Sequence, residues 1–179
     1  MKRPETSIRT VSSLLSMVAL LVLSCAAPEQ EPEIVVNLPV ETLEAVTDTN
    51  LVVLDTEVTS DGDGSFRVTV EQPVTVRLYD LTGIDMEGAD LVYRAHVRTD
   101  SIDDHVYLEM ICRFPNGAGD FSRAVRNPLY GTTDWTIQET AYTLAEGQSP
   151  ENVELNLAVN GTGTAWIDDI SIWRVPTED

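Results

Sequence analysis

Hydrophobic and polar residues alternate with a period of two along most of the chain after residue 64. The alternating runs cover residues 66–70, 74–78, 91–98, 106–114, 153–160 and 166–173. This pattern is typical of strands that bury one face, and no convincing amphipathic helix of twelve or more residues is present. Sequences rich in Gly, Asp, Asn and Pro separate the runs at residues 60–65, 115–120, 130–134, 146–152 and 160–163. The pattern predicts an all-β fold, an antiparallel β-sandwich or jelly roll.

The segment before these runs, residues 34–54, is apolar but irregular. Its apolar residues gather at 34–36 and at 51–53, on either side of an acidic stretch. The two apolar groups predict short strands, and we expect the acidic stretch between them to be helical.

The N-terminus has the organisation of an export signal. Basic residues precede an apolar run from Val11 to Leu23, which is shorter than the roughly 20 residues that cross a bilayer. The end of this run, Val22-Leu23-Ser24-Cys25, resembles the lipobox of bacterial lipoproteins. The resemblance implies acylation of Cys25 and cleavage before it, and several acyl chains anchor a protein stably. The alternative is an ordinary signal peptide cut near Ala26 or Ala27.

The lipoprotein interpretation divides the chain into three parts. Residues 1–24 form the signal peptide, residues 25–33 form an acylated, disordered tether with Pro and Glu, and residues 34–179 form one β-sandwich domain. Ala26 directly after the acylated cysteine favours the outer membrane. We therefore expect an exported protein of a bacterial cell envelope, held at the membrane by its lipid.

The negative charge of the chain limits the kinds of partner that it can bind. The whole sequence has a net charge of −19, and beyond residue 24 it holds 29 acidic residues against 8 basic ones, all of them arginine. So negative a field repels nucleic acid and anionic lipid surfaces, and nucleic acid is therefore not expected as a partner. Acid-rich, lysine-free surfaces resemble those of proteins from saline habitats, although a generic acidic secreted protein remains the alternative.

The sequence offers little for catalysis. It has no HExxH, GxSxG or GxxxxGK[ST] motif and no Cys/His cluster. The loop that starts at Asp61 begins like an EF-hand, but Phe66 and Gln72 stand where Gly and Glu are required, so we interpret it as a turn into the next strand. Cys112 alternates with apolar residues and is expected to be a small buried hydrophobe.

The polar faces of the predicted strands carry the candidate ligand site. Arg94 and His96 share one such face, and Tyr107, Glu109 and Arg113 share another. If these strands lie side by side, the five residues form one exposed surface of planar hydrogen-bonding groups suited to sugar hydroxyls, carboxylates or sulfates. The alternative is a solvated sheet face on which arginines pair with the excess acid.

Four segments, in order, resemble the galactose-binding-like jelly rolls, a family that includes many carbohydrate-binding modules. They are Asp61–Val68, Ala89–Thr99, Gly131–Trp135 and Gly161–Ile172, and the resemblance extends over about residues 51–174. The last segment, GTGTAWIDDISI, matches the closing strand, which in the family has a G-x-hydrophobic-hydrophobic-D-D-hydrophobic pattern. The resemblance implies a jelly roll and identifies a fold more securely than a ligand.

The same resemblance implies a structural calcium ion on Asp168, the first Asp of the closing pair. Independently, alternation places Asp168 with Trp166, Ile170 and Ile172 in the sandwich interior, and Asp169 outside. A buried carboxylate requires a cation or several donors, so Asp168 is expected to matter with or without metal. Tyr107 is the best candidate to stack on a sugar, because the three tryptophans are assigned to the core.

Together these features predict a non-catalytic envelope lipoprotein with a β-sandwich binding module whose ligand is a carbohydrate. A structural or protein-interaction lipoprotein of the envelope, without a sugar ligand, is the second interpretation. A glycoside-acting hydrolase is the third, and it would need two carboxylates facing each other in a deep cleft.

Overall fold

The computed structural model describes residues 31–84 and 86–177, and this part of the chain consists of β-strands, turns and loops. The strands are β1 (Glu33–Leu38), β2 (Val53–Asp55), β3 (Ser65–Val70), β4 (Val74–Thr82), β5 (Ala89–Arg113), β6 (Gly119–Arg123), β7 (Leu129–Leu144), β8 (Asn152–Asn160) and β9 (Gly163–Pro176). Within the described residues no helix could span a membrane. The predicted signal peptide and Cys25 lie outside them.

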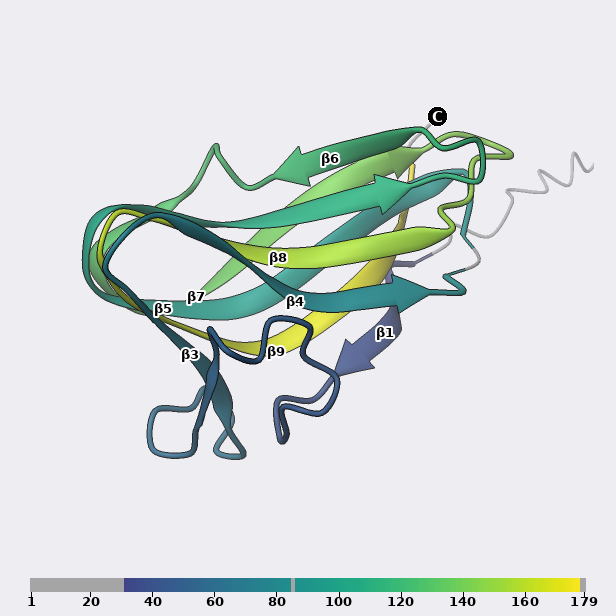
Figure 1. Ribbon diagram of the computed structural model, residues 1–179. Coiled ribbons are helices and arrows are strands. Elements are labelled where there is room, and N and C mark those ends of the chain that lie inside the picture. Colours follow the sequence, from purple (N-terminus) through teal and green to yellow (C-terminus); the bar gives the residue numbers. More distant parts are fainter. Residues whose placement is uncertain (1–30, 85, 178–179) are drawn as a thin grey trace, which may run out of the picture.

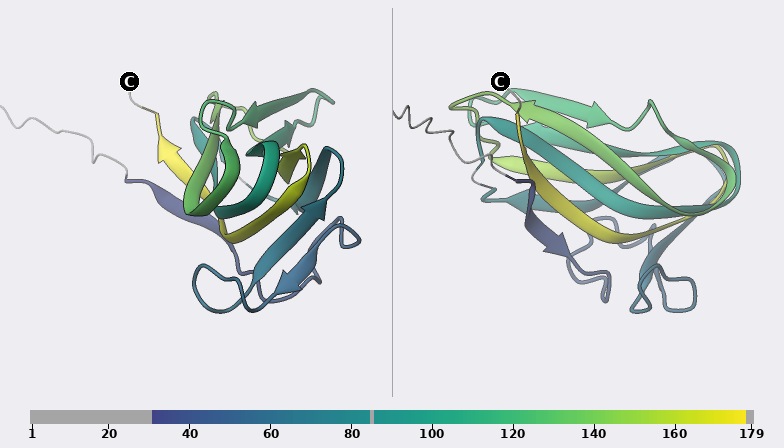
Figure 2. Two further views of the ribbon diagram at one scale, coloured as in Figure 1. Left: turned by 90° about the vertical axis from the view of Figure 1, so that its left-hand side faces the viewer. Right: turned by 180° about the vertical axis from the view of Figure 1, so that it is seen from behind.

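The strands form two layers that share one long strand, β5. Residues 89–100 of β5 pair with β7 on one side and β9 on the other, whereas residues 105–113 pair with β8 and β6. We call the first set the β9 layer; it also contains β1 and β3 on the far edge of β9, and β2 beside β3. The β8 layer has the order β4-β8-β5-β6. Every pair is antiparallel, and the curled arrangement in Figures 1 and 2 confirms the predicted all-β sandwich.

Alternation along the strands places one face of each layer in a common core. Tyr93, Ala95 and Val97 of the β9 layer are fully buried, as are Leu108 and Met110 of the β8 layer. Burying a large apolar side chain contributes roughly 1.5–3 kcal/mol, so this core supplies the main stabilisation.

Cys112 is a small buried hydrophobic residue, as predicted. Its side chain is in the core, and burial raises the pKa of its thiol to about 12. A thiol that stays protonated is a poor nucleophile, so Cys112 has a packing role.

The passage of β5 from one layer to the other depends on the turn between β8 and β9. Ser101, at the bend, has a positive φ of 55°. A Cβ on Gly163 would lie 2.6 Å from the Ser101 carbonyl oxygen, and Gly163 itself has a φ of 128°. Only glycine allows this close approach. The glycines of the 160–163 turn therefore let the two connections pack against each other.

The segment from 39 to 52 is not helical, so that prediction is wrong. It forms turns, and two of its amides, those of Thr47 and Asp48, donate to the carbonyl oxygens of Leu78 and Arg77 on β4. These bonds satisfy the backbone without a helix and cover the free edge of β4.

A bulge in β9 overturns the predicted alternation of its middle part. His96 pairs with Asp168 and Arg94 with Ser171, so β9 has one residue more than β5 between these pairs. The extra residue falls at Asp169, whose φ is +50°. Trp166 and Asp168 therefore point to the outside of the β9 layer, the side opposite to Ile170 and Ile172, which are in the core.

Candidate functional site

The outer face of the β8 layer carries a row of charged and amide side chains across all four strands. Cα pairing places Arg77 of β4 beside Asn156 of β8, Asn156 beside Glu109 of β5, and Glu109 beside Arg123 of β6. Neighbouring positions add further polar and aromatic residues. The polar sheet face, as we call it, comprises Arg77, Asp80, Tyr107, Glu109, Arg113, Phe121, Arg123, Glu154 and Asn156.

Two buried glutamates organise this face. The Glu154 carboxylate accepts from Arg113 Nε at 2.6 Å and lies 3.3 Å from Arg77 Nη2, although its side chain is only 5% exposed. Glu109 accepts from Arg123 Nε and, at 3.1 Å, from the Asn156 amide. The hydrogen bond to Glu109 raises the pKa of the Arg123 guanidinium. The carboxylates lie at the bottom and hold the guanidiniums in place above them.

The groups that face solvent are the guanidiniums. The side chains of Arg77 and Arg123 are 42% exposed and that of Arg113 is 54% exposed. One further acceptor, Asn156 Oδ1, is buried and has no hydrogen-bond partner within the described chain. Most buried polar atoms in proteins are paired, so this atom is an exception on the polar sheet face.

Aromatic rings border the polar sheet face. Phe121 is 54% exposed, and the Arg123 guanidinium lies 4.3 Å from its ring centroid. Tyr107 stacks on His105, with ring centroids 5.6 Å apart, and His105 also contacts Tyr130. A pocket of about 250 Å³ lies between Phe121, Arg113 and Arg123.

The five predicted ligand residues do not form one surface. Tyr107, Glu109 and Arg113 lie on the polar sheet face, as predicted for their strand. Arg94 and His96 lie on the outer face of the β9 layer. The prediction of a single face is wrong because one strand, β5, supplies all five residues and bends from one layer to the other between residues 100 and 105.

The structure adds two arginines and an aromatic ring that sequence reasoning missed: Arg77, Arg123 and Phe121. Phe121 and Arg123 are on β6, and the first residues of β6 belong to a Gly-rich stretch whose sequence predicts a turn. A weak signal was present, because Phe121 and Arg123 are two residues apart, as on one face of a strand. Arg77 was inside a predicted strand, but only pairing shows that it lies two strands from Glu109.

The three tryptophans are not in the core, contrary to expectation. Trp166 donates to Asp55 Oδ2 and lies 5.8 Å below the Arg98 guanidinium, on the outer face of the β9 layer. Trp173 lies under Arg94 in the same way, at 4.7 Å. Trp135 is also partly exposed.

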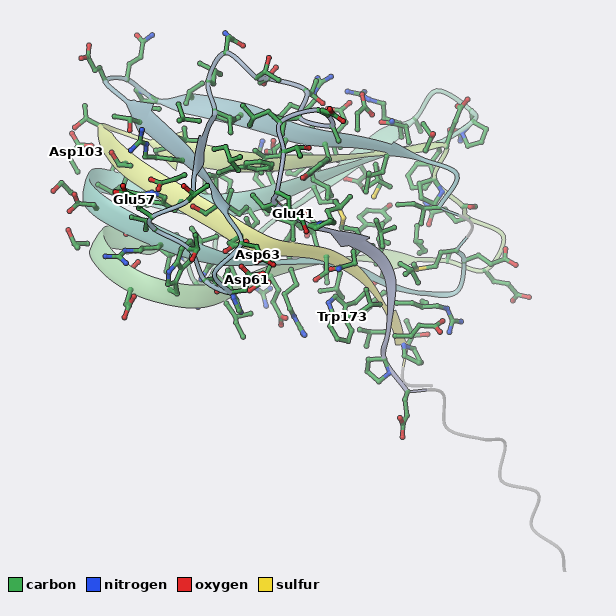
Figure 3. All side chains as sticks on the ribbon, turned by 90° about the horizontal axis from the view of Figure 1, so that it is seen from below. Glu41, Glu57, Asp61, Asp63, Asp103 and Trp173 are labelled. Atoms are coloured by element: carbon green, nitrogen blue, oxygen red, sulfur yellow. The ribbon has the colours of Figure 1, made fainter. Side chains whose placement is uncertain are left out.

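Asp168 is buried, as predicted, but beneath a loop and not inside the sandwich. Its side chain accepts from the backbone amides of Ser60 and Asp169, both at 2.8 Å. Burial raises its pKa, these two bonds lower it, and the charges of Asp61 and Asp169 raise it further, with a net rise. The loop from 56 to 64 thus covers a carboxylate whose ionised form is disfavoured. Asp61 and Asp63 of this loop are labelled in Figure 3.

These surroundings fit a calcium ion. Oxygen atoms of Asp61, Asp168 and Asp169 all lie within 4.8 Å of one another. Over residues 31–84 and 86–177 no arginine pairs with any of the three, and only His96 approaches, with Nδ1 2.6 Å from Asp169 Oδ2. Converging carboxylate oxygens without a cation suit a hard divalent ion such as Ca²⁺.

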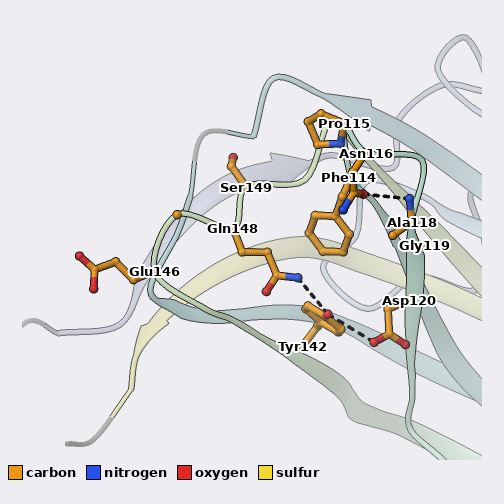
Figure 4. A pocket seen from close by; sticks show the side chains of 11 residues that line it. Phe114, Pro115, Asn116, Ala118, Gly119, Asp120, Tyr142, Glu146, Gln148 and Ser149 are labelled. Carbon is orange, nitrogen blue, oxygen red and sulfur yellow. Dashed lines mark hydrogen bonds between the residues drawn. The ribbon is translucent and has the colours of Figure 1, made fainter.

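A second pocket, of about 540 Å³, opens at the end of the sandwich where the β5–β6 turn meets the β7–β8 loop (Figure 4). We call it the rim pocket. Phe114 and Tyr142 form its apolar side, and Asp120, Glu146, Gln148 and Ser149 are among its polar residues. Its volume is in the range of small-molecule sites.

Comparison with known proteins gives structural but no sequence relatives. No protein-family model matches the chain, and no curated protein matches its sequence. Solved structures do match. The CBM22-1 xylan-binding domain from Paenibacillus barcinonensis Xyn10C superposes with a TM-score of 0.59 at 13% identity, over 83% of this chain and 99% of that one. The chain has the jelly-roll fold of such modules.

Two further structures agree. A family 16 carbohydrate-binding module superposes with a TM-score of 0.56 at 13% identity, over 78% of this chain and 99% of that one. The CBM22-1–GH10 modules of Clostridium thermocellum endo-1,4-β-D-xylanase 10B, in complex with xylohexaose, give a TM-score of 0.58 at 12% identity. That match covers 79% of this chain and 28% of the xylanase. At these identities the similarity shows the fold alone.

Proposed function

We propose that the protein is a non-catalytic binding module of the bacterial cell envelope and that it binds a polysaccharide on the polar sheet face. The supporting observation is the arrangement of that face. Buried Glu109 and Glu154 hold three guanidiniums across four strands, with aromatic rings at the borders. Groups held in this way lose little conformational entropy when they bind, which favours affinity.

The chemistry of the face suits a sugar chain. Guanidiniums donate several hydrogen bonds in one plane, and those of Arg77, Arg113 and Arg123 are partly exposed, so sugar hydroxyls find donors there. Phe121 offers an apolar surface for the C–H face of a sugar ring. The structural neighbours include domains named for xylan binding, which makes xylan the first polysaccharide to test.

The same contacts support a binding role over hydrolysis. A glycosidase needs one carboxyl group that is protonated and able to donate to the leaving oxygen. On the polar sheet face, both buried glutamates accept hydrogen bonds from arginine, so their oxygens are engaged within the protein and are not placed to donate a proton to a ligand.

The location is part of the proposal and rests on the sequence. Acylation of Cys25 would hold the module at the outer membrane, with residues 26–33 as the spacer. A calcium ion held by Asp61, Asp168 and Asp169 would fix the 56–64 loop on the outer face of the β9 layer, on the opposite side of the sandwich from the polar sheet face.

The test is calorimetric titration of the purified protein with soluble xylan and other soluble polysaccharides. We expect binding to one of them, and we expect Phe121→Ala to weaken it roughly tenfold, since a ring contact is worth about 1 kcal/mol or more. Arg94→Ala is the matched control, because Arg94 lies on the other layer and pairs with the exposed Glu139. Equal losses in both variants, or no binding to any polysaccharide, would contradict the proposal.

A protein-interaction role is the second candidate, and the outer face of the β9 layer favours it. Trp166 and Trp173 lie there under arginines, and Ile34 and Ile137 are more than half exposed. Aromatic residues and arginine are enriched at protein interfaces. Cross-linking on intact cells that depends on Trp173, with no polysaccharide bound, would favour this candidate.

A further inference from the structure

We propose that the rim pocket is a second binding site and that it takes a ligand with a positively charged organic ammonium group. The pocket is separate from the contacts that hold Arg77, Arg113 and Arg123 on the polar sheet face. It has a volume of about 540 Å³, enough for a sugar unit or a small organic cation.

A pair of aromatic rings lines one side of the rim pocket. Phe114 and Tyr142 lie with centroids 6.1 Å apart and planes inclined at 42°, so the rings form an angled wall (Figure 4). An ammonium group within about 6 Å of an aromatic face is attracted by the ring quadrupole, and angled rings of this kind recognise alkylated ammonium groups.

Two carboxylates give the rim pocket a negative charge. Asp120 is exposed beside Tyr142, and Glu146 stands at the edge of the pocket (Figure 4). Neither carboxylate forms an ion pair with an arginine of the described chain, and the pocket's own lining includes no arginine. The pocket is therefore negative within a molecule that is already strongly acidic, and this favours a cation over a neutral or anionic ligand.

Hydrogen-bond donors in the rim pocket are largely engaged within the protein. The Gln148 amide donates to the Tyr142 hydroxyl at 3.4 Å, and that hydroxyl donates to Asp120 Oδ2, also at 3.4 Å. The Ser149 hydroxyl donates to the Ile84 carbonyl oxygen. Tyr142, Gln148 and Ser149 thus each direct a donor to an acceptor within the protein, whereas the carboxylates of Asp120 and Glu146 offer acceptors to a ligand. A ligand that donates several hydrogen bonds, as an ammonium group does, complements this arrangement.

Asp120 is the residue with the best geometry for the cation. Its Oδ1 accepts from the Phe121 amide at 2.8 Å, which fixes the carboxylate, while the long contact to Tyr142 leaves Oδ2 weakly engaged. Burial of Tyr142 raises the pKa of its phenol, and the Asp120 charge raises it further, so the ring stays neutral at neutral pH. A charge-assisted bond to Oδ2 would replace a weak contact with a strong one.

The experiment is calorimetric titration of the purified protein with a glucosamine tetramer, with its N-acetylated counterpart and with choline. We expect at least one charged ligand to bind and the acetylated tetramer to bind at least tenfold more weakly than the free amine. Preference for the tetramer assigns an amino sugar, and preference for choline assigns a small quaternary ammonium compound. Equal affinity for both tetramers with none for choline, or no binding to either charged ligand, overturns the proposal.

Variants locate the site. Asp120→Asn keeps the shape of the side chain and should weaken ammonium binding roughly three- to tenfold, as loss of one partly exposed charge partner does. Glu44→Gln is the control, since it removes the same charge from an exposed position outside the pocket. An equal effect of the two variants would show general electrostatic attraction and overturn the site.

One more pair of variants separates this site from the polar sheet face, because Asp120 also borders the pocket beside Phe121. Tyr142→Leu should abolish ammonium binding and leave polysaccharide binding unchanged, whereas Phe121→Ala should do the reverse. Failure of polysaccharide binding alone would refute the proposed function and leave the rim pocket standing. Ammonium binding that survives Tyr142→Leu, in a variant with unchanged circular dichroism, would refute the rim pocket.

Discussion

Replacing Asp168 by Asn should have different consequences for stability with and without calcium. With calcium bound, Asp168 is a buried ligand and its loss should destabilise the fold. Without calcium, the same carboxylate is buried beside two others, and burial raises its pKa. Its charge is then unfavourable to the folded state. Asp168→Asn should therefore have little cost in chelator and a clear cost in calcium.

The magnitudes follow from the geometry. Two unit charges 4.8 Å apart repel by about 1 kcal/mol even at the dielectric constant of water. Asn relieves that repulsion but can accept only one of the two amide bonds from Ser60 and Asp169, a loss of about 1 kcal/mol. The two effects nearly cancel. Calcium at a hundred times its dissociation constant would stabilise the wild type by about 2.7 kcal/mol, a rise in Tm of about 5–10 °C for a domain of this size.

The pH dependence has a definite sign. Because the folded-state pKa of Asp168 lies above its ordinary value of 3.8, the folded protein binds more protons than the unfolded chain between those two values. In chelator, this residue's contribution to stability should fall as pH rises through that window and stay low above it. Asp168→Asn should remove that part of the pH dependence.

Thermal unfolding followed by circular dichroism measures these effects in calcium, in magnesium and in EDTA, for the wild type and Asp168→Asn. The reasoning holds if calcium raises the Tm of the wild type alone. An identical wild-type Tm in calcium and EDTA would refute the calcium proposal. A calcium response of equal size in Asp168→Asn would place the ion elsewhere.

Four further predictions are independent of the calcium ion. Cys25→Ser should release the protein from membranes or block its processing, because the acyl chains are the strong anchor. If cell fractionation finds the variant in the membrane as before, the lipoprotein interpretation is contradicted. The Tm should rise between low salt and about 1 M salt as screening relieves repulsion among the excess acids, and a constant or lower Tm would count against adaptation to salt. Burial raises the pKa of Asp55, but hydrogen bonds from Trp166 and two backbone amides, together with the charge of Arg67, lower the pKa overall, so the ionised Asp55 stabilises the fold above pH 3.8 and this stabilisation is lost as pH falls through the lowered pKa. The stabilities of the wild type and Asp55→Asn, measured as a function of pH, should therefore converge in that acidic range. In EDTA, where calcium is absent, Asp169→Ala should cost about 1 kcal/mol more than Asp169→Asn in thermal unfolding, because the φ of +50° disfavours Ala and is tolerated by Asn. Equal costs would contradict the bulge.

Strand identity could be predicted from the sequence because it depends on local alternation. The runs that contain Phe66, Val76, Leu108 and Leu157 all became strands with these residues in the core. A bulge is not visible in such a pattern, since it changes parity without changing composition. At Asp169 this inverted the predicted direction of Trp166 and moved Asp168 from the sandwich interior to the space beneath a loop.

The candidate site could be predicted only in part, since it depends on which strands become neighbours. The pairing of Glu109 with Asn156 could be expected, because both lie on the polar faces of predicted strands. The pairing of Glu109 with Arg123 could not, because it depends on the β5–β6 hairpin. Arg94 was separated from Arg113 by a bend within one continuous strand. Sequence periodicity carries no information about which layer each half of β5 joins.

The distribution of charge makes a neutral polysaccharide a better ligand for the polar sheet face than an anionic one. Seven of the eight arginines beyond residue 24 form ion pairs within the described chain. On the polar sheet face, three guanidiniums meet the carboxylates of Glu109, Glu154 and Asp80, so this face is close to neutral. An anionic sugar would compete with the buried glutamates for the same guanidiniums, and displacing either glutamate would leave a buried charge unpaired. Carboxylates without an arginine partner converge instead at Asp61, Asp168 and Asp169, and others line the rim pocket; these are the two places where cations are proposed. The proposed sites are thus divided by charge, with a hydroxyl-rich chain on the balanced face and cations at the acidic sites.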